Sequence, residues 1–468
     1  MAPVRRIPAE EASRALRDRA ARWPDDRLPG DRLSGVAKVR LDPSFGFSRQ
    51  DRVLTLGSCF AREIENRLDQ LGFDLPMKQV RVPEEERQNK TENDLLNKYT
   101  IQSIENELRW ASGEAAPHPE KLFVETADGL WHDPQLIHSA TPLPIERVKA
   151  RRALVQDAVG QFPSCRLVIL TLGLAEAWWD EETGLYLNTA PPTAALRRYP
   201  GRFALDVLSY DDILASMERC WEILQARGHP DLKMLVTVSP VPFKVSFSGE
   251  DALQANTYSK AVQRAACRAF VERHAGVDYF PSYEIVTLTA RELAFERDNA
   301  HVATPIVNHI MDEVLRAYAP EVEVARQDVA APKTRSAANE GTHFDLIVLA
   351  KHHMEEGDFA AAEAACAELI ARFEGRIPAH VLGRCRYLYA SAFFRQRNWA
   401  DAARQYELAA PLDPQDGLVH YKLGQALEKL GEHARAVAAY EQAVAMNSAR
   451  AEFRDRLERA RAARKSAA

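Results

Sequence analysis

The fold is decided by one stretch near residue 55, which reads Val53-Leu54-Thr55-Leu56-Gly57-Ser58-Cys59-Phe60-Ala61. A short apolar run meets a glycine–serine turn, and apolar residues then recur at helical spacing through Ile64, Leu68 and Leu71. The pattern predicts a strand, a sharp turn and a helix, in that order. A serine at such a turn lies at the carboxyl edge of a parallel sheet, where open α/β folds bind ligands.

Three further strand-like runs follow, at residues 167–172, 234–238 and 277–280. The first of them, Leu-Val-Ile-Leu-Thr-Leu, is apolar at all positions but one, which is typical of a strand covered on both faces. Helical patterns between or beside the strands lie at 94–111, 211–225 and 258–274. The alternation predicts an α/β fold: a three-layer, doubly wound, mainly parallel sheet with helices on both faces.

Composition and charge exclude several classes of protein. The chain has 468 residues, 46% of them hydrophobic and 27% charged, which is globular composition in a chain too long for one ordinary domain. A net charge of −6 argues against a large nucleic-acid footprint. The longest apolar run, 167–175, is far shorter than a membrane span. The first eighteen residues resemble no secretion signal, so we expect a cytoplasmic protein without a membrane span.

The six cysteines contain no Cys-x-x-Cys pair and are scattered along the chain. This spacing fits neither a disulfide scaffold nor a zinc site, so we expect reduced thiols. Cys59 follows the turn directly, and a thiolate at a helix N-terminus has a lowered pKa. As the first helical residue, however, it is better interpreted as packing between sheet and helix.

A repeat occupies the end of the chain. Tyr387 and Tyr406 recur as Tyr421 and Tyr440, an offset of 34, with small residues recurring between them. This period and these residue classes resemble the tetratricopeptide repeat, whose helical hairpins stack into a protein-binding array. We therefore expect four parts: an N-terminal arm at 1–45, an α/β domain at 46–318, a linker at 319–343, and a repeat module with a capping helix at 344–468.

A second short motif, Asp298-Asn299-Ala300-His301, comes just before a helix that Thr304-Pro305 is expected to open with a hydroxyl N-cap. Residues three apart can meet on one turn, so the carboxylate can accept from one imidazole nitrogen. The other nitrogen is then left to take a proton from a serine. A serine hydroxyl is a weak nucleophile without such a base.

The string Gly57-Ser58-Cys59-Phe60-Ala61 is the signature of the GSCFA domain family, which is similar to the SGNH/GDSL hydrolases. The resemblance runs from about residue 54 to 317. It includes the stretches Asn97-Lys98-Tyr99, Asn106 to Trp110, Thr171 to Trp178, Ser239-Pro240-Val241 and Tyr279 to Glu284.

The resemblance implies Ser58 as nucleophile, His301 as general base and Asp298 as its orienting acid. It also implies an oxyanion hole built from the backbone N–H groups of Ser58 and Gly173. Ala175 stands where those hydrolases carry an asparagine that donates a third hydrogen bond, and Asn188 is the candidate replacement.

The expected chemistry is acyl transfer on an O-acylated carbohydrate or small ester, and it needs no metal or organic cofactor. An esterase and an O-acyltransferase acting on a polysaccharide precursor share the acyl-serine intermediate and differ only in the acceptor. A third possibility is a non-catalytic scaffold, in which the sheet domain binds glycan and the repeats recruit a protein partner. The missing asparagine favours this third class slightly.

Overall fold

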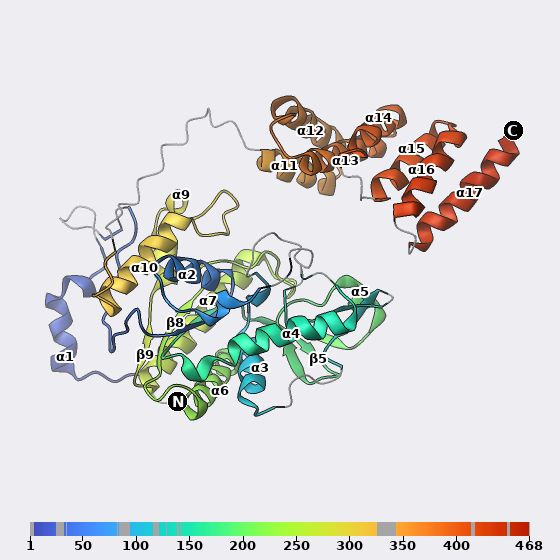
Figure 1. The fold of residues 1–468 in the computed structure, drawn as a ribbon. Coiled ribbons are helices and arrows are strands. Elements are labelled where there is room, and N and C mark those ends of the chain that lie inside the picture. The colour runs from blue at the N-terminus through green and yellow to red at the C-terminus, as the bar shows by residue number, and fades with distance from the viewer. Residues whose placement is uncertain are drawn as a thin grey trace. The chain divides into compact units, whose positions relative to one another are not determined.

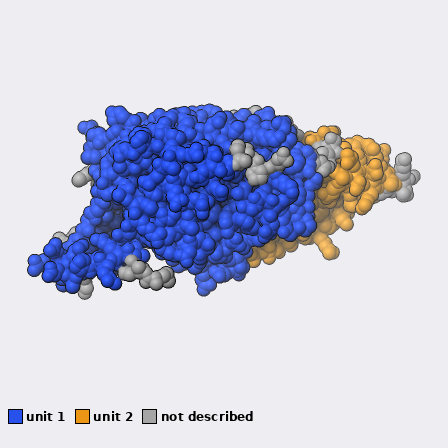
Figure 2. Space-filling view, turned by 90° about the horizontal axis from the view of Figure 1, so that it is seen from below, with its two compact units in different colours: residues 1–334 blue, residues 335–468 orange. Residues whose placement is uncertain are grey.

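The computed structural model describes residues 4–24, 32–33, 35–81, 83, 94–115, 121–127, 129–137, 140, 142–324, 343–412, 417–446 and 450–467. The chain divides into two compact units, residues 1–334 and 335–468, which Figure 2 distinguishes by colour. Most of the expected linker, residues 325–342, lies outside the described residues. No helix of the described residues is both long and apolar enough to cross a bilayer.

The centre of the first unit is a four-stranded parallel sheet in the order β1-β4-β8-β9. Its strands are β1 (Val53–Gly57), β4 (Leu167–Leu172), β8 (Lys233–Val238) and β9 (Val277–Tyr279). Every residue of β1 and β4 is buried, as the continuous apolar runs predict for strands covered on both faces.

Helices cover both faces of this sheet (Figure 1). Alternate residues of β1 point to opposite sides: Leu54 and Leu56 join one core, and Val53 joins the other. The first core is closed by α3 (Ile101–Ser112), α4 (Ile145–Val159), α6 (Tyr210–Arg227) and α7 (Ala252–Arg273), and the second by α2 (Cys59–Gln70), α8 (Ser282–Leu288) and α10 (Thr304–Tyr318). The expected three-layer α/β fold is confirmed.

Smaller elements surround the layers. A three-stranded antiparallel sheet in the order β6-β5-β7 was not predicted from the sequence. The remaining elements of this unit are α1 (Ala9–Arg14), β2 (Val124–Ala127), β3 (Leu130–His132), β5 (Glu176–Asp180), β6 (Leu185–Leu187), α5 (Thr193–Arg198), β7 (Phe203–Val207) and α9 (Arg291–Ala294).

Two helix starts differ from expectation. The pattern at 94–111 is interrupted: a 3-10 turn spans Asp94–Leu96, residues 97–99 are non-helical, and α3 begins at Ile101. The Thr100 side chain caps α3 by accepting from the Ser103 N–H. At α10, Ala303 is the N-cap and makes no side-chain cap, so Thr304 is already the first helical residue.

The second unit consists of helical hairpins, as the repeat predicts. In the two 34-residue units, the rings of Tyr387 and Tyr406 lie 5.6 Å apart, and those of Tyr421 and Tyr440 lie 5.7 Å apart. A Cβ on Gly424 would lie 2.5 Å from the Tyr440 ring, which explains the small residue there. The helices are α11 (His343–Glu356), α12 (Phe359–Phe373), α13 (Ala379–Arg395), α14 (Trp399–Ala409), α15 (Gly417–Lys429), α16 (His433–Met446) and α17 (Ala451–Ala467).

Candidate active site

Ser58 is the N-cap of α2, directly after β1, and it is buried. Gly57 makes the turn possible, because its φ is +149° and a Cβ there would lie 1.8 Å from the Thr171 Oγ1. The Ser58 hydroxyl donates to the Ser239 hydroxyl at 3.3 Å. Ser239 follows β8, so the ends of two strands position the serine at the carboxyl edge.

Two backbone N–H groups at this edge are free to bind an anion. In the described part of the chain, neither the Ser58 N–H nor the Gly173 N–H donates a hydrogen bond. Gly173 follows β4 and packs closely on the segment around Tyr99. A Cβ at this position would lie 2.7 Å from the Tyr99 carbonyl oxygen. Free N–H groups held in a rigid turn can stabilise a developing oxyanion.

The Asp298–His301 loop joins α9 to α10 and holds its two side chains together. The His301 Nδ1 lies 2.5 Å from the Asp298 Oδ2, and the N–H groups of Ala300 and His301 donate to the other carboxylate oxygen. Burial alone would raise the pKa of Asp298, but these hydrogen bonds lower it below its ordinary value. Asn299 completes the tight loop with a φ of +57°.

The helices that follow Ser58 and His301 run in the same direction. The end of α10 lies at the amino edge of the sheet, where the Tyr318 carbonyl accepts from the Phe47 N–H at 2.9 Å. The chain beyond α2 returns to the same edge. There the ring centroids of Phe73 and Phe47 lie 6.0 Å apart, and the Asp74 carbonyl accepts a hydrogen bond from the N–H of Val53, the first residue of β1. Since α2 packs against α10, both helices begin at the carboxyl edge, and Ser58 and His301 share it.

The two side chains nevertheless differ in their surroundings. The His301 side chain is 66% exposed and the Asp298 side chain 48%. Among the described residues, the hydrogen bonds of the Ser58 hydroxyl do not include His301. The structure therefore joins Asp298 to His301, and places Ser58 at the same edge without a direct hydrogen bond to either.

Asn188 makes three hydrogen bonds within the fold. Its amide nitrogen donates to the Asn97 carbonyl at 2.8 Å, while its amide oxygen accepts from the Tyr99 N–H and the Ser103 hydroxyl. Because both ends of the amide are used, Asn188 holds the segment 97–99 in place, and its contacts are with this segment and α3 rather than with Ser58.

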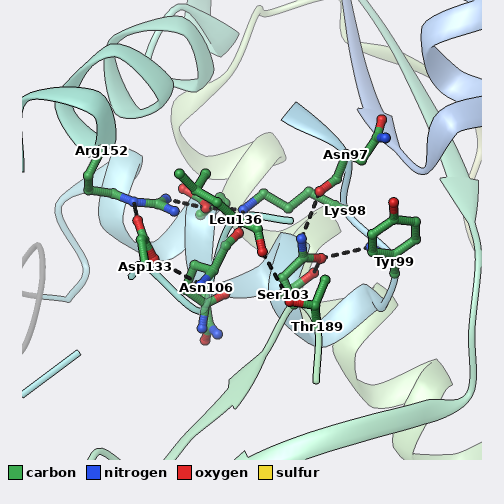
Figure 3. A network of polar contacts seen from close by, with 12 residues as sticks. Asn97, Lys98, Tyr99, Ser103, Asn106, Asp133, Leu136, Arg152 and Thr189 are labelled. Atoms are coloured by element: carbon green, nitrogen blue, oxygen red, sulfur yellow. Dashed lines mark hydrogen bonds and ion pairs between the residues drawn. The ribbon is translucent and has the colours of Figure 1, made fainter. Parts of the chain in front are cut away.

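Segment 97–99 is also anchored by a buried charge network, drawn in Figure 3. The Lys98 ammonium pairs with Glu107, which also pairs with Arg152, and Arg152 donates to Asp133 at 2.7 Å. All four side chains are buried. Burial raises and the two cations lower the pKa of Glu107, and the net direction is downward.

Sequence reasoning missed this network, although it carried a signal. Glu107 lies on the apolar face of α3, beside Leu108 and one turn after Ile104. A carboxylate on that face needs a buried partner, because an unpaired buried charge is strongly unfavourable. The partner itself, Lys98, could not be identified while residues 94–111 were interpreted as one helix.

Lys260 is another buried cation near the site. Its ammonium donates to the Gly173 carbonyl at 2.6 Å, and Gln263 donates to the same oxygen at 3.2 Å. Burial lowers the pKa of Lys260 to about 7, and only the nearby Cys59 opposes this shift. Cys59 is half-buried at the first position of α2, whereas the other five cysteines are fully buried.

A family model fits this sheet domain. The GSCFA family matches residues 52–314, which is more than half of the chain. The chain belongs to the GSCFA family. No curated protein matches it.

A tetratricopeptide repeat model matches residues 417–449 of this GSCFA protein, which correspond to the hairpin α15–α16. Similar solved structures include the first tetratricopeptide domain of the human RPAP3 protein, with 20% identity over 26% of this chain and 93% of that one, at a TM-score of 0.24. The Sgt2 tetratricopeptide domain from Aspergillus fumigatus is 18% identical over 29% and 87%, at a TM-score of 0.24.

Proposed function

We propose that this GSCFA protein transfers acyl groups through an acyl-enzyme formed on Ser58. The observation that carries the proposal is the combination at one sheet edge of a buried serine with two unoccupied N–H donors, those of Ser58 and Gly173. A tetrahedral intermediate formed on Ser58 would place its oxyanion between such donors. Loss of one donor costs about two to three orders of magnitude in rate in comparable sites.

In the proposed reaction, the Ser58 oxygen bonds to the carbonyl carbon of an ester while His301 takes the serine proton. The ester C–O bond then breaks, and the alcohol leaves with the proton that His301 returns. Water or a sugar hydroxyl attacks the acyl-serine in the second half, again losing its proton to His301. The bond between the acyl carbon and the Ser58 oxygen then breaks, and His301 returns the proton to the serine. Asp298 fixes the imidazole through Nδ1, which leaves Nε2 for the proton.

This step requires the exposed His301 ring to turn toward Ser58 once substrate is bound. Catalytic hydrogen bonds are commonly long or unaligned in a free enzyme and tighten in the substrate complex. The exposure of His301 leaves room for such a rotation, and the Ser58 hydroxyl would exchange its bond to Ser239 for one to the imidazole.

For the substrate we propose an O-acylated carbohydrate or a small ester, by analogy with similar hydrolases. An esterase gives the acyl group to water, and an O-acyltransferase gives it to a glycan hydroxyl. Comparing acyl release into water with acyl transfer to added glycan distinguishes the two.

A fluorophosphonate probe tests the proposal, because it reacts with activated serines and leaves a covalent mark. We expect labelling of the full chain at Ser58, loss of labelling in Ser58→Ala, and unchanged labelling in Cys59→Ala. Labelling at Cys59 would reverse the assigned roles. Equal labelling of Ser58→Ala and the wild type would contradict the proposal.

A second candidate function is a non-catalytic glycan-binding scaffold. The observation in its favour is that the Ser58 hydroxyl contacts Ser239 rather than a base. Two results together would support the scaffold over the enzyme. The wild-type chain would not be labelled by a fluorophosphonate, and Ser58→Ala would bind glycan as well as the wild type does.

We also infer that the repeat module, residues 344–468, binds a protein partner in the cytoplasm, as tetratricopeptide arrays commonly do. Its stacked hairpins supply the extended surface that such binding uses. A pull-down with this module tests the inference, and recovery of no specific partner would count against it.

A further inference from the structure

Asn97 is a buried asparagine whose side chain has no hydrogen-bond partner among the described residues. The residue is 3% exposed, and its Oδ1 is enclosed without a donor. Unpaired buried amides are rare in folded proteins because they lose their hydrogen bonds to water and gain nothing in return. A ligand that completes the hydrogen bonding would explain why an amide stands here.

The position of Asn97 points to the ligand. The next residue, Lys98, donates its N–H to the Gly57 carbonyl at 2.8 Å, directly beside the turn that carries Ser58. Tyr99 accepts from the Leu174 N–H at 2.7 Å, directly beside Gly173. The segment 97–99 therefore bridges the two strand ends that supply the free N–H groups.

The side chain of Asn97 also points in a suitable direction. The Lys98 ammonium enters the buried charge network, and Figure 3 shows the Asn97 amide pointing away from it. The Asn97 carbonyl is held by Asn188, so the backbone of the segment is fixed while the amide stays unpaired.

We propose that the Asn97 side chain is the third oxyanion donor, with Nδ2 directed at the acyl oxygen that the N–H groups of Ser58 and Gly173 bind. The proposal rests on the acyl transfer proposed above. It supplies from segment 97–99 the amide that is absent at Ala175 in the sequence after β4. A half-turn about χ2 exchanges Oδ1 and Nδ2, so the donor can face the site without any movement of the backbone.

The test measures the second-order rate constant for fluorophosphonate labelling of Ser58 in the full-length protein, because the phosphonyl oxygen occupies the oxyanion position. We expect Asn97→Ala to lower this rate constant by about 10²–10³-fold, as loss of one oxyanion donor does. The melting temperature should stay the same or rise, because the lost amide pairs with nothing in the free protein.

Two further variants separate a donor from other roles. Asn97→Asp keeps an acceptor oxygen, loses the donor and adds a negative charge beside the oxyanion, so its rate should be no higher than that of Asn97→Ala. Asn106 is a matched control, a buried asparagine that donates to the Tyr186 carbonyl at 2.8 Å. Asn106→Ala should lower the melting temperature and change the labelling rate less than about 5-fold, well below a catalytic effect.

The outcomes distinguish this proposal from the one on which it rests. Labelling of Ser58 at the wild-type rate in Asn97→Ala, or recovery of that rate in Asn97→Asp, would overturn the donor role and leave the acyl-enzyme standing. A fall in melting temperature that accounts for the lost labelling would also overturn it. A wild-type chain that is not labelled at Ser58 would overturn both proposals together.

Discussion

The two halves of the proposed site are built in opposite ways. The Ser58 turn is buried, follows a fully buried strand, and tolerates only glycine at the preceding position. The Asp298–His301 loop is exposed and is held by hydrogen bonds among its own residues and to the nearby Arg291 and Glu296. The core therefore fixes the proposed nucleophile and oxyanion donors, whereas the proposed base lies on a surface loop, where a substrate could change its position.

The largest expected effect is a loss of stability from a substitution in the buried Ser58 turn. Gly57→Ala would force a Cβ into Thr171 at a φ of +149°, so we expect a loss of about 3–5 kcal/mol in the free energy of unfolding. Chemical denaturation measures it. Gly201→Ala is the matched control, since Gly201 has a φ of +80° and an added Cβ would meet nothing within 4 Å, and we expect a loss of about 1 kcal/mol there. Equal losses would show that the turn is not constrained by Thr171.

Substitutions in the exposed Asp298–His301 loop should lower the labelling rate and leave stability unchanged. His301→Ala should lower the rate of Ser58 labelling by about 10²–10⁴-fold, the contribution of a general base, with an unchanged melting temperature. The labelling rate of Asp298→Asn should lie between those of His301→Ala and the wild type, because the imidazole keeps a neighbouring side chain but loses its charged acceptor. His229, far along the chain before β8, provides the control variant His229→Ala, whose labelling should equal that of wild type. A stability loss in His301→Ala would mean that the loop is part of the core.

The smallest of these effects concerns the support beneath Gly173 and depends on pH. Lys260 has a pKa of about 7 when folded and an ordinary value of 10.5 when exposed, so the unfolded chain binds more protons between these values. The cost of burying the ammonium is therefore complete below pH 7 and falls as the pH rises. Lys260→Met removes this cost, so its stability gain over wild type should be about 3 kcal/mol smaller at pH 9.5 than at pH 6.

Denaturation of both proteins at the two pH values measures this difference. A gain that is the same at pH 6 and pH 9.5 would show that Lys260 does not titrate in this range. Comparing the two proteins at each pH removes the effects of other groups that titrate at high pH, because these groups are common to both.

The sequence alone predicts the parts of the molecule that follow one strong local pattern. The run 167–172, apolar at all positions but one, predicted β4, because a parallel sheet buries both faces of its strands. The glycine–serine turn predicted the position of Ser58. The 34-residue recurrence predicted the helical hairpins, because the same ring pair closes each one.

The parts that escaped prediction depend on partners distant in sequence. Residues 97–99 interrupt what reads as one apolar period, since Leu95, Leu96 and Ile101 all face the core although a non-helical segment separates them. The contacts that fix this segment come from Gly57, Leu174 and Asn188, none of which a local pattern can pair with it. Residue type alone therefore suggests Asn188 as an oxyanion donor, while its actual neighbours give it a supporting role.

One property of β1 has a consequence for assembly. This strand is at the border of the parallel sheet, where exposed peptide groups would invite another chain to add a strand. The strand is fully buried, and three of its outward-facing groups are already used: the Val53 N–H donates to the Asp74 carbonyl, the Thr55 carbonyl accepts from the Arg62 guanidinium, and the Gly57 carbonyl accepts from the Lys98 N–H. The border nearest the serine is thus closed to intermolecular β-pairing, which protects the most apolar part of the sheet from aggregation through that route.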